Sequence, residues 1–240
     1  MKEADSNKID VNHLEQYDLL ELIHARLKCP ETQDEVFDKF IIQNFGIEKI
    51  LSEEEKTHDA LLQWYLGICY FFGNGCDEDE NKTFEWLSKS VKQGNHVGQL
   101  LLGLCYDNGI GCKKDENKAF QCYKASAEQE DADAQWALGN CYFDGTGCEQ
   151  DYKKAFEWYK KSAEQEDAIA QYSLGKCYCG GLGCVKDYKK AFEWFKKSAE
   201  QGDADAQCAL GNCYYEGIGC VKDLHKAAEY FKKATDRTDE

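Results

Sequence analysis

Residues 132–167 read ADAQWALGNCYFDGTGCEQDYKKAFEWYKKSAEQED, and close copies of this stretch fill the last three quarters of the 240-residue chain. The copies keep one register, with a period of 36 residues. Each copy has a Leu-Gly pair followed by a Cys-Tyr pair, and the leucines are Leu66, Leu102, Leu138, Leu174 and Leu210. A strict repeat of this length predicts a solenoid, in which each unit buries its apolar face on its neighbours. Such a protein works through an extended surface, which favours binding over catalysis.

Each copy predicts two helices. In the quoted copy, Ala134, Leu138 and Cys141 lie at helical spacing on one side of the first helix, where Gly139 leaves room for a neighbouring helix. Paired glycines should end this helix in a tight turn, because glycine tolerates positive φ. An aspartate then opens the second helix, because its carboxylate accepts the free N–H groups of the first turn. The glycine pairs are Gly73/Gly75, Gly109/Gly111, Gly145/Gly147, Gly181/Gly183 and Gly217/Gly219; the aspartates are Asp79, Asp115, Asp151, Asp187 and Asp223.

The shared pattern of the copies resembles the Sel-one-like repeat, a relative of the tetratricopeptide repeat. It reads Ala-x-Ala-Gln-x-x-Leu-Gly-x-x-Tyr-x-x-Gly-x-Gly, then Asp-x-x-Lys-Ala-x-x-Trp-Tyr-x-Lys-x-Ala, in five tandem copies over residues 60–236. The resemblance implies an all-α, right-handed superhelical solenoid of αα-hairpin repeats, whose concave face is lined by the first helix of each hairpin. It also implies a non-enzymatic scaffold or adaptor that binds a peptide or a partner protein, in complex assembly or signalling.

We divide the chain into an N-terminal segment, 1–56, and five repeats at 57–95, 96–131, 132–167, 168–203 and 204–240. The N-terminal segment lacks the repeat pattern. Its apolar residues recur every third or fourth position in 13–27 and 36–51, which predicts two amphipathic helices separated by Pro30. One interpretation is a helical cap over the open apolar end of the solenoid. The other is a helix pair that recruits a partner.

The composition narrows the range of partners and locations. The net charge is −16 and the pI is about 4.8, which argues against nucleic acid and anionic membrane surfaces. Residues 1–10 do not resemble a secretory signal, and no apolar run reaches the ~18 residues that a membrane span needs. We therefore expect a cytoplasmic, monomeric protein without a membrane span, whose partner is a protein or a peptide.

The chain contains fourteen cysteines, which is unusual for a cytoplasmic protein. Ten of them lie in phase on either side of the glycine turns, as Cys69/Cys76, Cys105/Cys112, Cys141/Cys148, Cys177/Cys184 and Cys213/Cys220. A turn can bring such a pair within disulfide distance, whereas free cysteines behave as small buried apolar side chains. We favour reduced thiols in the repeat core.

An alternative function follows from the family resemblance. A secreted cysteine-rich bacterial branch, for which a β-lactamase activity has been claimed, carries its disulfide at positions that Ala163 and Gln171 occupy here. That bridge is therefore absent from this chain, and the catalytic association does not carry over with it. An exported, disulfide-stapled repeat protein with hydrolase activity is the alternative; a third is a degenerate array with no ligand.

No motif predicts catalytic, cofactor or metal chemistry. Cys177, Cys179 and Cys184 lack the C-x-x-C and histidine spacing of a zinc site. The histidines, His13, His24, His58, His96 and His225, are scattered and match no catalytic arrangement. The glycine turns lack the following lysine of a phosphate-binding loop. We therefore expect no enzymatic activity, no cofactor and no metal.

The predicted binding groove comes from first-helix positions that avoid the core, at 36-residue intervals. One stripe is Trp64, Leu100, Trp136, Tyr172 and Cys208; a second is Ile68, Leu104, Asn140, Lys176 and Asn212. Large apolar side chains dominate the N-terminal end of these stripes and polar ones the other end. Exposed aromatic residues commonly anchor a bound partner. The alternative is that Trp64 and Trp136 pack between repeats.

Overall fold

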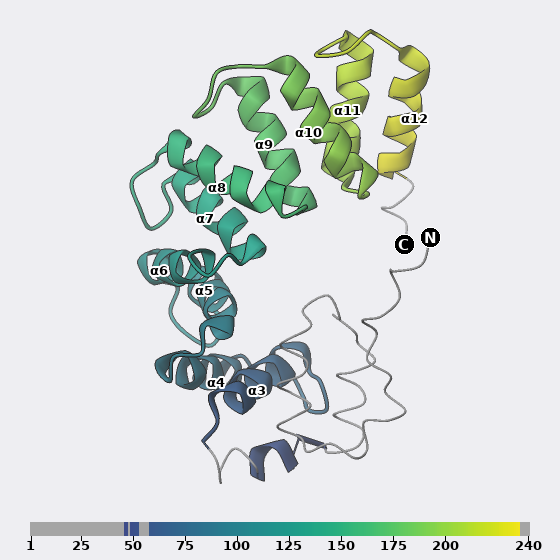
Figure 1. Ribbon diagram of the computed structural model, residues 1–240. Helices are drawn as coiled ribbons and strands as arrows, with labels where there is room; N and C mark the ends of the chain where they lie inside the picture. Colours follow the sequence, from purple (N-terminus) through teal and green to yellow (C-terminus); the bar gives the residue numbers. More distant parts are fainter. Residues whose placement is uncertain (1–45, 48, 53–57, 236–240) are drawn as a thin grey trace, which may run out of the picture. The chain divides into compact units, whose positions relative to one another are not determined.

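Successive helical hairpins build the protein, as the computed structural model of Figure 1 shows for residues 46–47, 49–52 and 58–235. The chain divides into two compact units, Met1–Asp115 and Glu116–Glu240. Unit 1 contains α3 (Ala60–Phe72), α4 (Glu80–Lys92), the 3-10 helix η2 (His96–Gly98) and α5 (Gln99–Asn108). Unit 2 contains α6 (Glu116–Ala127), α7 (Ala132–Asp144), α8 (Tyr152–Glu164), α9 (Ala168–Gly180), α10 (Tyr188–Glu200), α11 (Ala204–Glu216) and α12 (Leu224–Thr235).

The predicted all-α repeat fold is confirmed, since the described residues contain helices and no strand. Residues 46–47 and 49–52 are helical, and Ile50 is fully buried. The rest of the N-terminal segment, including the predicted helix at 13–27 and most of that at 36–51, lies outside the described residues. In the part of the chain that the structure covers, no helix has both the length and the hydropathy that a membrane crossing requires.

Side-chain and glycine caps fix the ends of the helices, as predicted. The aspartates that open the second helices, Asp79, Asp151, Asp187 and Asp223, accept hydrogen bonds from first-turn N–H groups. The first helices end at glycines with φ between 67° and 80°, which are Gly73, Gly109, Gly145, Gly181 and Gly217. A second set of aspartates, Asp59, Asp131, Asp167 and Asp203, caps the start of the first helices. Each repeat thus specifies its own helix boundaries.

A glycine in the first helix permits close packing inside each hairpin. A Cβ atom on Gly139 would lie 2.6 Å from the ring of Tyr159, and one on Gly175 would lie 2.6 Å from the ring of Phe195. Both distances are shorter than any real Cβ contact, so only glycine lets the aromatic ring rest on the helix backbone. The sequence prediction for Gly139 is confirmed.

An aromatic pair joins each hairpin to the next within a unit. Phe192 of α10 meets Tyr214 of α11 edge to face, with ring centres 5.3 Å apart and ring planes at 90°. The same contact recurs as Phe84–Tyr106, Phe120–Tyr142 and Phe156–Tyr178. The turn glycines complete this interface, because a Cβ on Gly183 would lie 2.0 Å from the carbonyl oxygen of Tyr152 in the preceding hairpin. Edge-to-face geometry is favoured for aromatic rings, and a recurring contact of this kind couples neighbouring repeats.

Candidate functional site

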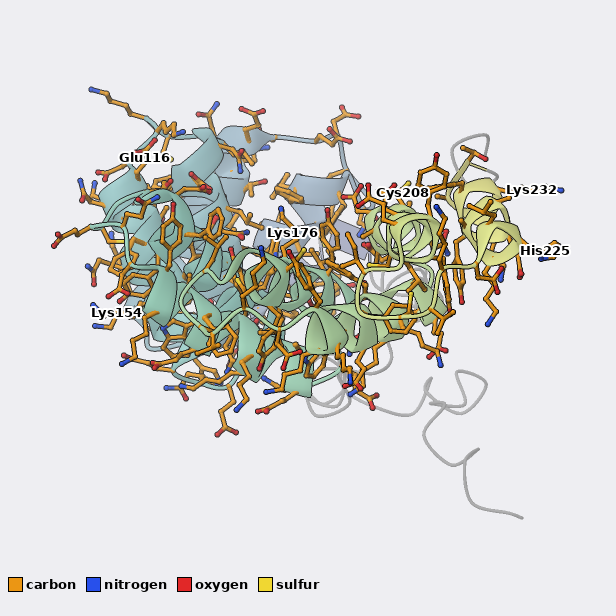
Figure 2. All side chains as sticks on the ribbon, turned by 90° about the horizontal axis from the view of Figure 1, so that it is seen from above. Glu116, Lys154, Lys176, Cys208, His225 and Lys232 are labelled. Carbon is orange, nitrogen blue, oxygen red and sulfur yellow. The ribbon has the colours of Figure 1, made fainter. Side chains whose placement is uncertain are left out.

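The predicted groove residues differ in how far they remain accessible. In unit 1, the side chains of Trp64, Ile68, Leu100 and Leu104 are half-buried. In unit 2, those of Trp136, Asn140 and Tyr172 are half-buried, whereas Lys176, Cys208 and Asn212 are exposed. Figure 2 shows Lys176 on α9 and Cys208 on α11, both on first helices of their hairpins. Among the predicted groove residues of unit 2, the exposed ones therefore lie in its two C-terminal repeats.

The first stripe takes part in packing between repeats. The indole N–H of Trp136 donates a hydrogen bond to the Ser173 hydroxyl in the next repeat at 3.3 Å. The ring of Tyr172 lies 5.8 Å from that of Phe195 and packs against the Leu210 cluster of the following repeat. These aromatic side chains thus pack between successive repeats, and only part of their surface remains accessible.

The corresponding tryptophan in unit 1 has no such hydrogen bond. The Nε1 atom of Trp64 is buried and has no hydrogen-bond partner among the described residues. Leu101 stands in the next repeat at the position that Ser173 occupies in unit 2, so the hydroxyl acceptor is missing. The Trp64 ring instead rests beside Gly98, where an added Cβ would lie 3.5 Å from its Cδ1 atom. The interpretation that Trp64 and Trp136 pack between repeats therefore has support at both positions.

One residue of the second stripe stabilises the fold, whereas others are exposed at the surface. Asn140 accepts a hydrogen bond from the hydroxyl of Tyr159 at 2.7 Å, so its side chain stabilises its own hairpin. The next hairpin has Phe195 at the Tyr159 position, and the exposed Lys176 stands where Asn140 would be. The Lys176 ammonium lies 5.3 Å from the centre of the Tyr172 ring. Lys176 and Asn212 are thus the exposed members of this stripe.

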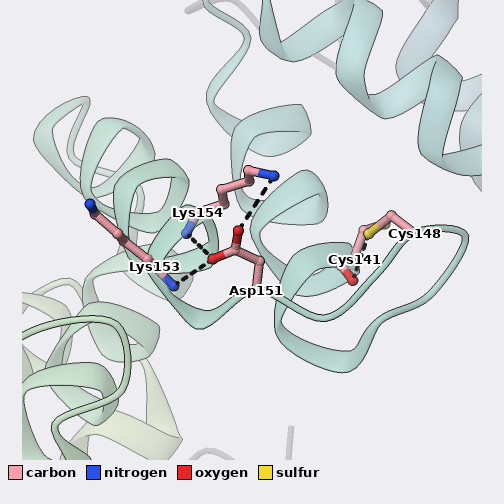
Figure 3. Close-up of polar contacts among 5 residues, drawn as sticks. All are labelled: Cys141, Cys148, Asp151, Lys153 and Lys154. Carbon is pink, nitrogen blue, oxygen red and sulfur yellow. Dashed lines mark hydrogen bonds and ion pairs between the residues drawn. The ribbon is translucent and has the colours of Figure 1, made fainter.

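The paired cysteines form caps on the first helices. The Cys148 thiol donates to the Cys141 carbonyl oxygen at 3.4 Å, beside the Asp151 cap of α8 (Figure 3). The equivalent contact recurs at 3.4–3.6 Å for Cys76, Cys112, Cys184 and Cys220. None of the described cysteines is part of a disulfide. Each pair therefore joins one buried thiol and one that hydrogen-bonds to a helix terminus.

Burial suppresses the reactivity of the core thiols. It raises the pKa of Cys177 and of Cys213 to about 12 and that of Cys122 to about 11. Since the thiolate is the nucleophile, these groups are poor nucleophiles at neutral pH. Within the described residues, no group of three or more His, Cys, Asp and Glu side chains is arranged to hold a metal ion.

Two hollows that the sequence did not predict lie beside the second helices of unit 2. One, of about 570 Å³, is lined by residues that include Trp158, Lys161 and Gln135; the other, of about 500 Å³, has Trp194, Lys197 and Gln171 at the same positions. In each hollow the lysine already covers the tryptophan ring, at 3.8 Å and 4.3 Å from the ring centre. An amide hydrogen bond within the hairpin, from Gln165 to Gln135 at 3.0 Å, joins two residues that line the first hollow. Each tryptophan ring is thus already covered by a lysine of its own helix.

The repeats match the Sel1 repeat at residues 60–95, 96–131, 132–167, 168–203 and 204–239. A solved protective antigen of uropathogenic Escherichia coli with an SLR fold is 26% identical over 92% of this chain, with a TM-score of 0.76. This chain spans only 49% of that antigen. A Sel1 repeat protein of Oxalobacter formigenes is 28% identical, with 85% of each chain covered and a TM-score of 0.74. Comparison with curated protein sequences finds no match.

Proposed function

Because five Sel1 repeats fill residues 60–239, the chain belongs to the Sel1 repeat family, and we propose that it is a non-enzymatic scaffold that binds a peptide or a partner protein. Proteins of this family generally serve as interaction scaffolds. The proposed binding surface consists of the residues of both groove stripes that lie in unit 2. The observation that carries it is the series of exposed, chemically varied groups, Lys176, Cys208 and Asn212, beside the half-buried rings of Trp136 and Tyr172.

The two kinds of residue would serve different purposes in binding. The partly buried rings are held rigid by packing and by the Trp136–Ser173 hydrogen bond, so they offer apolar contact at little entropic cost. The exposed lysine, cysteine and asparagine would select among partners through charge and hydrogen bonding. An apolar segment with polar or acidic groups at one end would fit this arrangement.

Paired substitution of Trp136→Ala and Tyr172→Ala tests the groove. Interface anchors cost about 2 kcal/mol or more of binding free energy when truncated. Proteins captured from native extract by the wild-type chain should be lost with this variant, whose melting temperature should also fall because both rings pack between repeats, while its helical circular dichroism shows that it remains folded. Trp158→Ala is the matched control, because Trp158 is also half-buried but lies on a second helix. Capture that survives the paired substitution in a folded protein would refute the groove.

We also propose a cytoplasmic location and a capping role for residues 1–56. The hydrogen-bonded thiols suit a reducing compartment. The fully buried Ile50 is what favours the cap. Deleting residues 1–56 should then lower solubility and melting temperature by uncovering repeat 1, which includes Leu61, Leu62 and Tyr65. A truncated chain that remains monomeric and melts unchanged would instead support a separate recruiting element.

A further inference from the structure

A row of exposed apolar side chains follows the glycine-turn edge of unit 2. It comprises Tyr152, Val185, Tyr188, Tyr215, Val221 and Leu224, here called the turn-edge strip. Val185 is 88% exposed and Val221 is 86% exposed, so neither contributes to the core. Val185 and Val221 lie in the loops that join α9 to α10 and α11 to α12 (Figure 1), whereas the other four residues lie at helix ends beside such turns: Tyr152, Tyr188 and Leu224 open second helices, and Tyr215 lies near the end of α11. The strip shares no residue with the groove stripes.

Contacts between repeats make the strip continuous. Gly183 rests on the backbone of Tyr152, and an added Cβ would lie 2.0 Å from the Tyr152 carbonyl oxygen. Gly219 rests on Tyr188 in the same way, also at 2.0 Å. Each loop therefore sits on the first turn of the preceding second helix. This packing carries the apolar row from one repeat to the next.

The other copies show that the fold does not require apolar residues at these positions. The position of Val185 and Val221 is occupied by Asp77, Lys113 and Glu149 in the first three repeats, and every one of these residues is exposed. The position of Tyr188 and Leu224 is occupied by Glu80 and Glu116 in the first two repeats, both also exposed. Burial therefore does not explain the apolar residues of repeats 4 and 5. A cluster of exposed apolar side chains on a soluble protein commonly marks an interaction surface.

The two strip segments that begin at Val185 and Val221 carry a net positive charge, opposite in sign to that of the chain, whereas the segment around Tyr152 is neutral because Glu149 and Asp151 balance Lys153 and Lys154. Residues 185–190 hold three lysines and one aspartate, whereas the whole chain carries a net charge of −16. Residues 221–226 hold two lysines, His225 and one aspartate. Asp187 accepts hydrogen bonds from N–H groups of α10, and Asp223 from one of α12, so both carboxylates face the helix termini. Lys186 and Lys222 border the aromatic rings of Tyr188 and Tyr215, at 4.8 Å and 5.3 Å from the ring centres.

We propose that the turn-edge strip is a docking surface for an acidic segment of a partner protein that also carries apolar side chains. The valines, tyrosines and Leu224 would bury the partner's apolar groups, and the bordering lysines would pair with its carboxylates. The remainder of this acidic chain would repel the same segment, which restricts its docking to the strip. A basic segment would instead be repelled by the lysines beside the strip and attracted to the acidic remainder of the chain.

The test uses a library of displayed random 16-residue peptides, selected on the full chain and counter-selected on the variant Val185→Glu/Val221→Glu. Glutamate at this loop position is tolerated, because Glu149 occupies it in repeat 3. Enriched peptides should combine Asp or Glu with Leu, Phe or Trp. Their dissociation constants should rise at least tenfold in the variant and should also rise with salt. Lys113→Glu, a change at the same loop position outside the strip, should leave binding intact.

Valine methyl NMR then locates the bound peptide, because the chain has only six valines. The expected result is shifts at Val185 and Val221 without shifts at Val91 and Val97. The proposal is overturned if selection enriches no peptide, if it enriches basic peptides, or if the enriched peptides bind the variant equally. It is also overturned if the full chain dimerises through Val185 and Val221. Trp136→Ala/Tyr172→Ala should retain peptide binding, so failure of the groove and failure of the strip are distinguishable.

Discussion

The coupling between repeats makes a prediction that is sharpest at Phe192. This side chain packs against Tyr214 and against the apolar clusters of repeats 4 and 5. Phe192→Ala removes the ring from both clusters and leaves a cavity at the only aromatic pair that joins α10 to α11 among the described residues. A fully buried Phe→Ala change costs about 3–5 kcal/mol, and Phe192 is half-buried, so we expect about 2–4 kcal/mol.

The loss should be local, because a repeat contacts only its neighbours. A cost of that size corresponds to a drop of about 30- to 1,000-fold in hydrogen-exchange protection, which should appear in α11 and α12. Protection in α7 and α8 should change little. Hydrogen exchange read by mass spectrometry resolves these helices and also shows whether the rest of the chain remains folded.

The chain offers its own control at the equivalent position of repeat 5. Ala228 replaces the phenylalanine there and is exposed. Ala228→Phe adds a ring that has no following repeat to meet in the described structure, so it should change stability by less than about 0.5 kcal/mol. The reasoning is refuted if Phe192→Ala leaves the protection of α11 and α12 unchanged, or if all hairpins of unit 2 lose protection equally.

Four further outcomes test the packing and the thiols. Gly183→Ala should cost about 3 kcal/mol or more by denaturant titration, because φ is +71° and the new Cβ meets the Tyr152 carbonyl; Gly94→Ala, with φ +89° and open space, should cost only about 1 kcal/mol. Ser173→Ala should cost about 1 kcal/mol by the same titration, because the Trp136 N–H loses its acceptor. Among the described thiols, the exposed Cys208 should react fastest with a thiol reagent in the native protein, and Cys208→Ser should remove this fast phase. Protein that is denatured without reduction should show fourteen reactive thiols, whereas a count near four would reveal five disulfides. The free energy of unfolding should fall as pH rises from 9 toward 12, because unfolded thiols ionise near their ordinary pKa of 9.0 while Cys177 and Cys213 keep their protons to about 12. The slope is at most about 1.4 kcal/mol per pH unit for each thiol, and Cys177→Ala/Cys213→Ala should flatten it.

The sequence alone predicted the features that each repeat determines locally. The positive φ of Gly145, the Asp151 cap and the close approach at Gly139 all follow from residue type and spacing. The cap at Asp131 was missed, although an aspartate directly before the first helix is a recognisable signal. The family resemblance supplied the stacking of these hairpins into a superhelical solenoid, which the pattern within one repeat leaves open.

Hydrogen bonds between particular side chains on different helices were beyond the same reasoning. The bond from Tyr159 to Asn140 depends on how two helices face each other, and that from Trp136 to Ser173 depends on how two repeats stack. The spacing of residues within one helix predicts neither of these two hydrogen bonds. A partial signal did exist, since Tyr159 accompanies Asn140 whereas Phe195 accompanies Lys176. Such a coupled difference between copies indicates that a groove position also serves its hairpin.

This distinction separates the two proposed surfaces. Variation along the groove stripe is explained in part by packing, because Ser173 supplies an acceptor to Trp136 and Tyr159 donates to Asn140. Variation along the turn-edge strip has no such internal explanation, since Val185 and Val221 are almost fully exposed and the same loop carries charged residues elsewhere. Substitutions in the groove therefore change stability and binding together, whereas those in the strip should change binding alone. A partner that is lost with Val185→Glu/Val221→Glu at unchanged stability would identify a contact surface that the repeat fold itself does not require.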